Sequence, residues 1–149
     1  RAGDPPLRAE IDVDITAVEL TDPPEVRTAD GVIYPTVSDA DMIESKVVSI
    51  FSRVYLQVRD LLDLFLFRNA LRPDSPARIR SKLSRQGIGP ERMLKQVRRI
   101  EENRVLHLRD LDQVIEEQVD RPAAENIRLG GGADGLLQSV LAILKEVSR

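Results

Sequence analysis

The sequence predicts an α+β protein that is predominantly helical, with a short N-terminal β-hairpin followed by a bundle of about five or six helices. The first observation is an alternating pattern in residues 8–19 and an Asp-Gly turn signal at residues 30–31. The second is that apolar residues after position 38 recur at intervals of three and four, between prolines and glycines. We therefore expect a strand and hairpin segment at 1–37 and a helical domain at 38–149.

Apolar and acidic residues alternate in the N-terminal segment. Ile11, Val13 and Ile15 would share one face of a strand, with Glu10, Asp12 and Asp14 on the other. Pro23-Pro24 ends the strand, because proline cannot donate to a ladder. Asp30-Gly31 predicts a hairpin turn, followed by a second short strand at 32–37. A lone hairpin is marginal in water, so residues 8–37 are expected to be the edge of a sheet with further strands outside this chain.

The expected helices span about 38–54, 58–71, 75–86, 90–103, 106–119 and 135–147. Ser38 or Asp39 can cap the first of them, Pro73 follows the second and Gly87 stops the third. The glycines at 130–132 are expected to form a hinge. The amphipathic last helix is expected in the core, and packing on a partner chain is the alternative.

Composition excludes several classes of site. The chain has no cysteine, so disulfides, thiolate metal sites and cysteine nucleophiles are impossible. The one histidine, His107, excludes a multi-histidine zinc site and is expected to be structural. We find no apolar run of roughly 20 residues and no signal peptide. We therefore expect a cytoplasmic protein that does not span or bind a membrane. The chain starts without methionine, close to a strand pattern, so we expect a piece of a longer protein.

Charge is distributed unevenly along the chain. Residues 1–49 carry eleven acidic and four basic side chains, a net −7, whereas residues 75–104 carry nine basic and three acidic ones, a net +6. These two surfaces could attract each other, or the basic part could contact phosphates of an RNA such as tRNA. The cations proposed for that contact are Arg78, Arg80, Lys82, Arg85, Arg92, Lys95, Arg98 and Arg99. A solvated helix surface is the simpler reading, since no aromatic residues are interleaved for base stacking.

The segment 41–67 combines apolar helices with charged side chains. Lys46 and Arg53 are two helical turns apart, and Arg59 and Asp63 are an i,i+4 pair. If the two helices pack antiparallel through a connection at 54–57, Lys46 can face the turn that carries Asp60 and Asp63. Such charges could hold a triphosphate, or they could form an ion network that only pins the helices together.

These residues resemble a known family. Glu44-Ser45-Lys46, then Arg53, then Arg59-Asp60-Leu61-Leu62-Asp63-Leu64 is similar to the C-terminal motifs of AbiEii/AbiGii-type nucleotidyltransferases. Those proteins are the toxin halves of bacterial abortive-infection toxin–antitoxin pairs. The resemblance covers about residues 7–71, and the segment from Arg8 to Asp12 is similar to the family's last acidic strand.

The resemblance implies a DNA-polymerase-β-like nucleotidyltransferase core, of which residues 1–37 would be a remnant. It also implies Mg²⁺ and a nucleoside triphosphate as cofactors, and an acceptor such as tRNA. Carried over, Lys46 and Asp60 become candidate catalytic residues. Lys46, Arg53 and Arg59 become candidate phosphate ligands, with Asp63 and Glu44 as structural partners. A cognate antitoxin would be a protein partner.

One part of the family pattern is missing. The chain has no Gly-Ser loop followed by Asp-x-Asp. Asp12 and Asp14 spell Asp-x-Asp without that loop and are weak metal-ligand candidates, while Glu10 or Asp12 fits an auxiliary carboxylate better. We therefore expect the catalytic half upstream and this chain alone to be inactive. The alternative is a non-catalytic helical protein–protein interaction module, with the acidic strand edge and the last helix docking on another chain or on a second copy.

Overall fold

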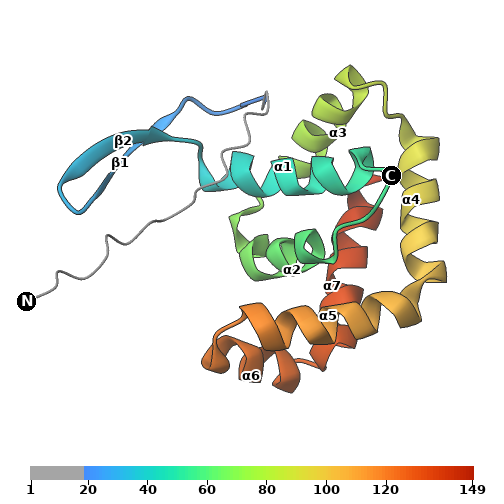
Figure 1. Cartoon of the computed structure of the whole chain (residues 1–149). Helices are drawn as coiled ribbons and strands as arrows, with labels where there is room; N and C mark the ends of the chain where they lie inside the picture. The colour runs from blue at the N-terminus through green and yellow to red at the C-terminus, as the bar shows by residue number, and fades with distance from the viewer. Residues whose placement is uncertain (1–18) are drawn as a thin grey trace, which may run out of the picture.

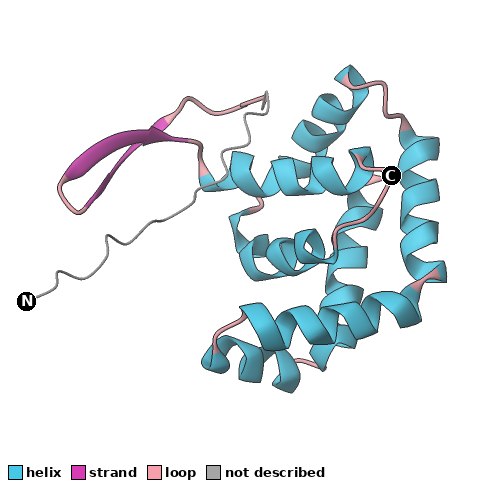
Figure 2. Cartoon of the chain, viewed as in Figure 1, coloured by secondary structure: helices cyan, strands magenta, loops and turns pink. Residues whose placement is uncertain are grey.

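The computed structural model describes residues 19–149, so residues 8–18 of the expected strand at 8–19, with Glu10, Asp12 and Asp14, lie outside the described residues. Within 19–149 the chain forms a two-stranded antiparallel hairpin followed by seven α-helices (Figures 1 and 2). The prediction of a mostly helical α+β fold is therefore confirmed.

The hairpin turns at the predicted Asp-Gly pair. Strand β1 (Glu25–Ala29) pairs with β2 (Val32–Thr36), and both turn residues have positive φ, 50° at Asp30 and 79° at Gly31. The register places Val26 opposite Pro35, Thr28 opposite Ile33 and Arg27 opposite Tyr34. Directly opposed residues share a face, so Val26 and Ile33 lie on one face and Arg27 on the other. The hairpin extends away from the helices and is almost wholly exposed (Figure 1).

Helices α1 (Asp39–Ser52) and α2 (Val58–Phe67) run antiparallel and pack together (Figure 1). The predicted cap forms at α1, where the Asp41 N–H donates to Ser38 Oγ at 3.0 Å. A short 3₁₀ helix, η1 (Arg68–Ala70), continues α2. The antiparallel packing on which the expected meeting of Lys46 with Asp60 and Asp63 depends is therefore present.

The remaining helices are α3 (Ser75–Arg85), α4 (Pro90–Glu102), α5 (Arg104–Gln118), α6 (Arg121–Leu129) and α7 (Gly132–Val147). Helix α6 is missing from the predicted elements, because Pro122 by itself indicates a break. Proline fits the first helical turn, where its missing N–H has no partner to lose. Asp120 caps that turn by accepting from the Ala123 N–H at 2.9 Å, so the proline opens a helix.

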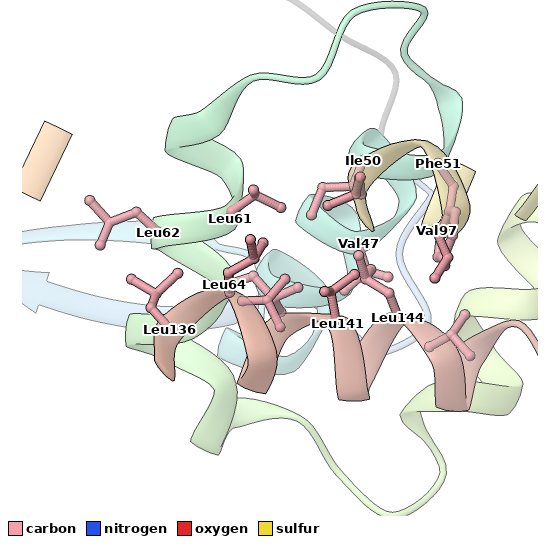
Figure 3. Close-up of a cluster of buried hydrophobic side chains, with 14 of the residues drawn as sticks. Val47, Ile50, Phe51, Leu61, Leu62, Leu64, Val97, Leu136, Leu141 and Leu144 are labelled. Atoms are coloured by element: carbon pink, nitrogen blue, oxygen red, sulfur yellow. The ribbon is translucent and has the colours of Figure 1, made fainter. Parts of the chain in front are cut away.

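Helix α7 lies in the centre of the core (Figure 3). Leu137, Val140 and Leu144 are fully buried, and α7 contacts α2, α3, α4, α5 and α6. The prediction that this helix belongs to the core is confirmed, and its apolar face is not available for a partner.

The turn between α6 and α7 is built from glycines. Gly131 and Gly132 have φ of 101° and 64°, a region that side chains disfavour. A Cβ on Gly135 would lie 2.2 Å from the Gly130 carbonyl oxygen. The turn bends the two helices by 77°, and only as this bent pair do they reach the length and hydropathy of a bilayer span. Within residues 19–149 no single helix does so.

Candidate functional site

Four of the predicted charged residues meet between α1 and α2. Lys46 Nζ lies 3.2 Å from Asp60 Oδ1 and 2.8 Å from Asp63 Oδ2. Arg53 Nη1 donates to Asp60 Oδ2 at 2.6 Å. Asp60 is buried, whereas both cations are partly exposed. We name Lys46, Arg53, Asp60 and Asp63 the α1–α2 ion cluster.

The α1–α2 ion cluster has two positive and two negative charges and is therefore neutral. Burial alone would lower the pKa of the Lys46 ammonium, but Asp63 and Asp60 outweigh this and raise the pKa above its ordinary value. Lys46 stays charged at neutral pH. An ammonium has three N–H donors, of which two point to these carboxylates and one is left for a ligand. The guanidinium of Arg53 likewise keeps further donors.

Two predicted residues lie outside this cluster. Arg59 is exposed on α2 and forms no ion pair with any side chain in the part of the chain that the structure describes. Its expected i,i+4 partner, Asp63, turns to Lys46 instead. Glu44 is fully buried on another face of α1 and contacts α3.

Glu44 belongs to a second and more deeply buried group of charges, which we name the α1–α3 ion network. Lys82 Nζ lies 2.6 Å from Asp41 Oδ1 and 2.8 Å from Glu44 Oε2, and all three residues are buried. Arg78 Nε lies 3.0 Å from Glu44 Oε1, and the Ser75 hydroxyl donates to the same oxygen at 2.8 Å. The network therefore pairs charges that burial would otherwise penalise, although within residues 19–149 the Arg78 Nε–H is close to Glu44 without a hydrogen bond.

The α1–α3 ion network also fixes the chain that leads into the hairpin. The N–H groups of Thr21 and Asp22 donate to the Asp41 carboxylate at 3.0 and 2.8 Å. Burial by itself would raise the pKa of Asp41, but Lys82 and these two N–H groups lower it well below its ordinary value. Arg72 and Arg78 pair with Asp22 at 3.0 and 3.2 Å. Asp41 thus connects α3, α1 and residues 21–22.

Sequence reasoning missed this network because its two halves are about forty residues apart. The charge pattern assigns Arg78 and Lys82 to a basic surface, but their side chains turn inward and are only 10% and 5% exposed. A signal is present in the sequence: Asp41 and Glu44 are i,i+3 neighbours, and Arg78 and Lys82 are i,i+4 neighbours, each pair on a helix with an apolar face.

A cavity of about 600 Å³ lies beside the α1–α2 ion cluster. It lies between the hairpin, α1, α2 and η1, and it is lined by Arg27, Asp39, Met42, Ile43, Lys46, Asp63, Leu66, Phe67, Asn69 and Ala70. Its size falls within the range of about 300–1,000 Å³ that small-molecule sites occupy. Lys46 and Asp63 belong to both the cluster and the cavity wall, so a ligand in the cavity would reach the cluster.

The outward-facing cations of the basic stretch lie on α3 and α4. They are Arg85, Arg92, Lys95, Arg98 and Arg99. Two of them are held by main-chain carbonyls: Arg92 Nη2 donates to Ser52 O at 3.3 Å, and Arg99 Nη1 donates to Val54 O at 2.8 Å. Arg80 is half-buried and donates to the Glu146 and Val147 carbonyls at the end of α7.

His107 lines a smaller cavity of about 190 Å³ with Tyr55, Gln96 and Arg99 among its neighbours. Its Nδ1 is buried without a hydrogen-bond partner within residues 19–149, and burial lowers the pKa of the imidazole. His107 is therefore neutral at physiological pH.

The described residues do not form a metal centre. Within 19–149 no three acidic or histidine side chains are grouped so that they could hold an ion. The carboxylates of the α1–α2 ion cluster, Asp60 and Asp63, both contact the Lys46 ammonium. The expectation of Mg²⁺ rests on the family resemblance and stays a prediction, and its weak candidates in this chain, Asp12 and Asp14, lie outside the described residues.

Comparison of the chain with protein-family models, with curated proteins and with solved structures finds no match in any of the three.

Proposed function

We propose that this chain is the C-terminal part of a nucleotidyltransferase-like protein that transfers a nucleotide from a nucleoside triphosphate to an acceptor such as tRNA. The observation that carries the proposal is the convergence of Lys46, Arg53, Asp60 and Asp63 beside a cavity of ligand size. These are the positions at which the sequence resembles the AbiEii/AbiGii-type toxins. Residues that bind one ligand must lie close together, and these four do.

In this proposal the cations of the cluster bind phosphate oxygens. Lys46 offers its third N–H, and Arg53 offers the guanidinium donors that do not contact Asp60. Asp60 contacts both cations from a buried position and so fixes where their free donors point. Its role here is to position Lys46 and Arg53.

The test is nucleotide transfer by the full-length protein, measured with each of the four α-labelled nucleoside triphosphates and total tRNA. We expect Lys46→Ala to lower the transfer rate about a hundred-fold, which is typical for the loss of one positioned donor to a developing charge. Arg109→Ala removes an exposed cation on α5, outside both the cavity lining and the proposed tRNA contact, and should leave the rate unchanged. Transfer by folded Lys46→Ala at the wild-type rate would end the site assignment.

A different observation favours a second function, that of a protein–protein interaction module. Val26 and Ile33 share one face of the hairpin and are each 72% exposed, and a two-stranded hairpin is marginal in water. A partner protein, for example an antitoxin or a second copy, would cover this face and pair with the free strand edge. Light scattering after size exclusion tests this, and a strictly monomeric chain that captures no partner counts against it.

A further inference from the structure

The cavity is a groove with polar ends and an apolar middle. Because α1 and α2 are antiparallel, the pair Lys46–Asp63 marks one end, and Asp39 and Asn69 belong to the opposite end. Asp63 and Asn69 are six residues apart, which corresponds to about 9 Å along a helix. Arg27 of the hairpin binds Asp39 at 2.6 Å and closes this second end.

The middle of the groove is made of large apolar side chains. Met42 and Ile43 come from α1, and Leu66 and Phe67 come from α2. Ile43 is buried, but Met42, Leu66 and Phe67 are 49%, 37% and 61% exposed. Exposed apolar groups gathered in a concave site with few polar groups are typical of ligand binding.

The charges of the groove do not explain affinity for an anion by themselves. Lys46 is balanced by Asp63, and Arg27 is balanced by Asp39. The α1–α2 ion cluster is neutral as a whole, so it supplies directed N–H donors but no excess positive charge. A phosphate-bearing ligand held at Lys46 therefore needs a second source of affinity, and the neighbouring apolar surface provides one.

We infer that this groove is the nucleobase subsite of the nucleotide that Lys46 and Arg53 bind, an assignment that rests on the proposed function. The base lies against the Phe67 ring and the Met42 and Leu66 side chains, with the phosphates at the Lys46 end. Base–aromatic stacking tolerates every base, because each has a π-face. The Asn69 side-chain amide can both donate and accept, and so can hydrogen-bond to a base edge.

The first experiment measures binding to the 149-residue chain by ¹H–¹⁵N chemical-shift titration with adenosine, cytidine, ATP and CTP. We expect the nucleosides to shift the amides of Met42, Leu66 and Phe67, and the triphosphates to bind more tightly. Phe67→Ala should weaken nucleoside and triphosphate alike about ten-fold. Lys46→Ala should weaken only the triphosphates.

The matched control is Tyr55→Ala, which removes an aromatic side chain that is 75% exposed and lies outside the groove. Its affinities should equal those of the wild type. The inference is overturned if nucleosides shift no groove amides, or if Phe67→Ala binds as well as Tyr55→Ala. Capture of a protein segment by the groove, with no nucleoside binding, also overturns it.

A second measurement separates this inference from the proposed function. In the full-length protein, Phe67→Ala should raise the KM for the nucleoside triphosphate about ten-fold and leave kcat nearly unchanged. Transfer with an unchanged KM in Phe67→Ala refutes the base subsite and leaves the transferase intact. Nucleoside binding in the groove without any transfer by the full-length protein refutes the transferase and leaves the subsite intact.

Discussion

Lys82 shows at the residue scale why a buried charge must be judged by its partners. Its ammonium is almost fully buried and contacts both Asp41 and Glu44. A buried ion pair contributes little net stability, because desolvation offsets the attraction between its members. Removal of one member is costly, however, since the other is left buried and unpaired.

We therefore predict that Lys82→Ala lowers the free energy of unfolding by about 3 kcal/mol or more. Lys95→Ala, which removes an exposed lysine from α4, should change it by less than about 0.5 kcal/mol. Urea denaturation of both variants measures the difference. Equal stabilities would show that the carboxylates of Asp41 and Glu44 find other partners.

Asp41 makes the stability of the folded protein depend on pH in the acidic range. Its pKa is lowered in the folded state, so its contribution to stability is present above the unfolded-state pKa of about 4 and is lost as the pH falls towards the folded-state value. We predict that the free energy of unfolding decreases between about pH 5 and pH 3. Asp41→Asn should be less stable at pH 7, with a flatter profile over that interval.

Urea denaturation at several pH values, from about 7 down to about 3, checks this prediction. Asp112→Asn is the control, because Asp112 is exposed on α5 and should leave the profile unchanged. If the free energy of unfolding of Asp41→Asn falls with pH as steeply as that of the wild type, other carboxylates cause the acid dependence.

The α6–α7 turn illustrates at the element scale how backbone geometry restricts a sequence. The Gly130 carbonyl oxygen occupies the place where a Cβ of residue 135 would lie. The oxygen belongs to the main chain and the added Cβ would be bonded directly to the main chain of α7, so neither atom can move away without a shift of a helix. The first turn of α7 can therefore pass the end of α6 only if residue 135 is glycine.

We predict that Gly135→Ser lowers the free energy of unfolding by about 2 kcal/mol, because a helix must shift to relieve the clash. Gly89→Ser is the matched control. Position 89 has φ −89° and open space around it, and it precedes α4 at the N-cap, where serine is favourable. Thermal unfolding of the two variants should rank Gly135→Ser well below wild type and Gly89→Ser at or above it.

The opposite charges of the two chain segments are matched in part within residues 19–149, where three of the nine cations at 75–104 pair with acidic residues of the first segment. Glu19 pairs with Arg85, Asp22 pairs with Arg78, and Asp41 and Glu44 pair with Arg78 and Lys82; Asp22 also pairs with Arg72, which precedes the basic segment. These ion pairs correspond to one of the two alternatives that the charge pattern left open, namely that the acidic and basic segments attract each other. What is left for a polyanion is the outer surface of α4, where Lys95 and Arg98 are exposed.

If α4 contacts tRNA in the full-length protein, the double variant Lys95→Glu/Arg98→Glu should weaken tRNA binding at least about ten-fold. The slope of log affinity against log salt concentration should also become shallower, by the amount expected for the loss of about two phosphate contacts. Fluorescence anisotropy with labelled tRNA at several KCl concentrations measures both effects. Arg109→Glu, an exposed charge reversal on α5, should have little effect. Equal loss in both variants would indicate a general effect of net charge.

The sequence by itself determined most of the local structure, because the signals are local. The Asp30-Gly31 turn, the Ser38 cap and the apolar periodicity of α7 depend on residues within a few positions of one another. It also placed Lys46 opposite Asp60 and Asp63, since two adjacent antiparallel helices leave few alternatives.

Only the tertiary structure decided which charged residues are buried together. Glu44 and Lys46 are two positions apart, yet one joins the α1–α3 ion network and the other the α1–α2 ion cluster, because a helix turns about 200° between them. From the sequence alone, Arg78 and Lys82 are expected to be surface cations. In the folded protein α3 packs on α1, and both side chains face Asp41 and Glu44. The groove likewise exists only in the tertiary structure, because α1, α2, η1 and the Arg27 side chain of the hairpin each supply part of its wall.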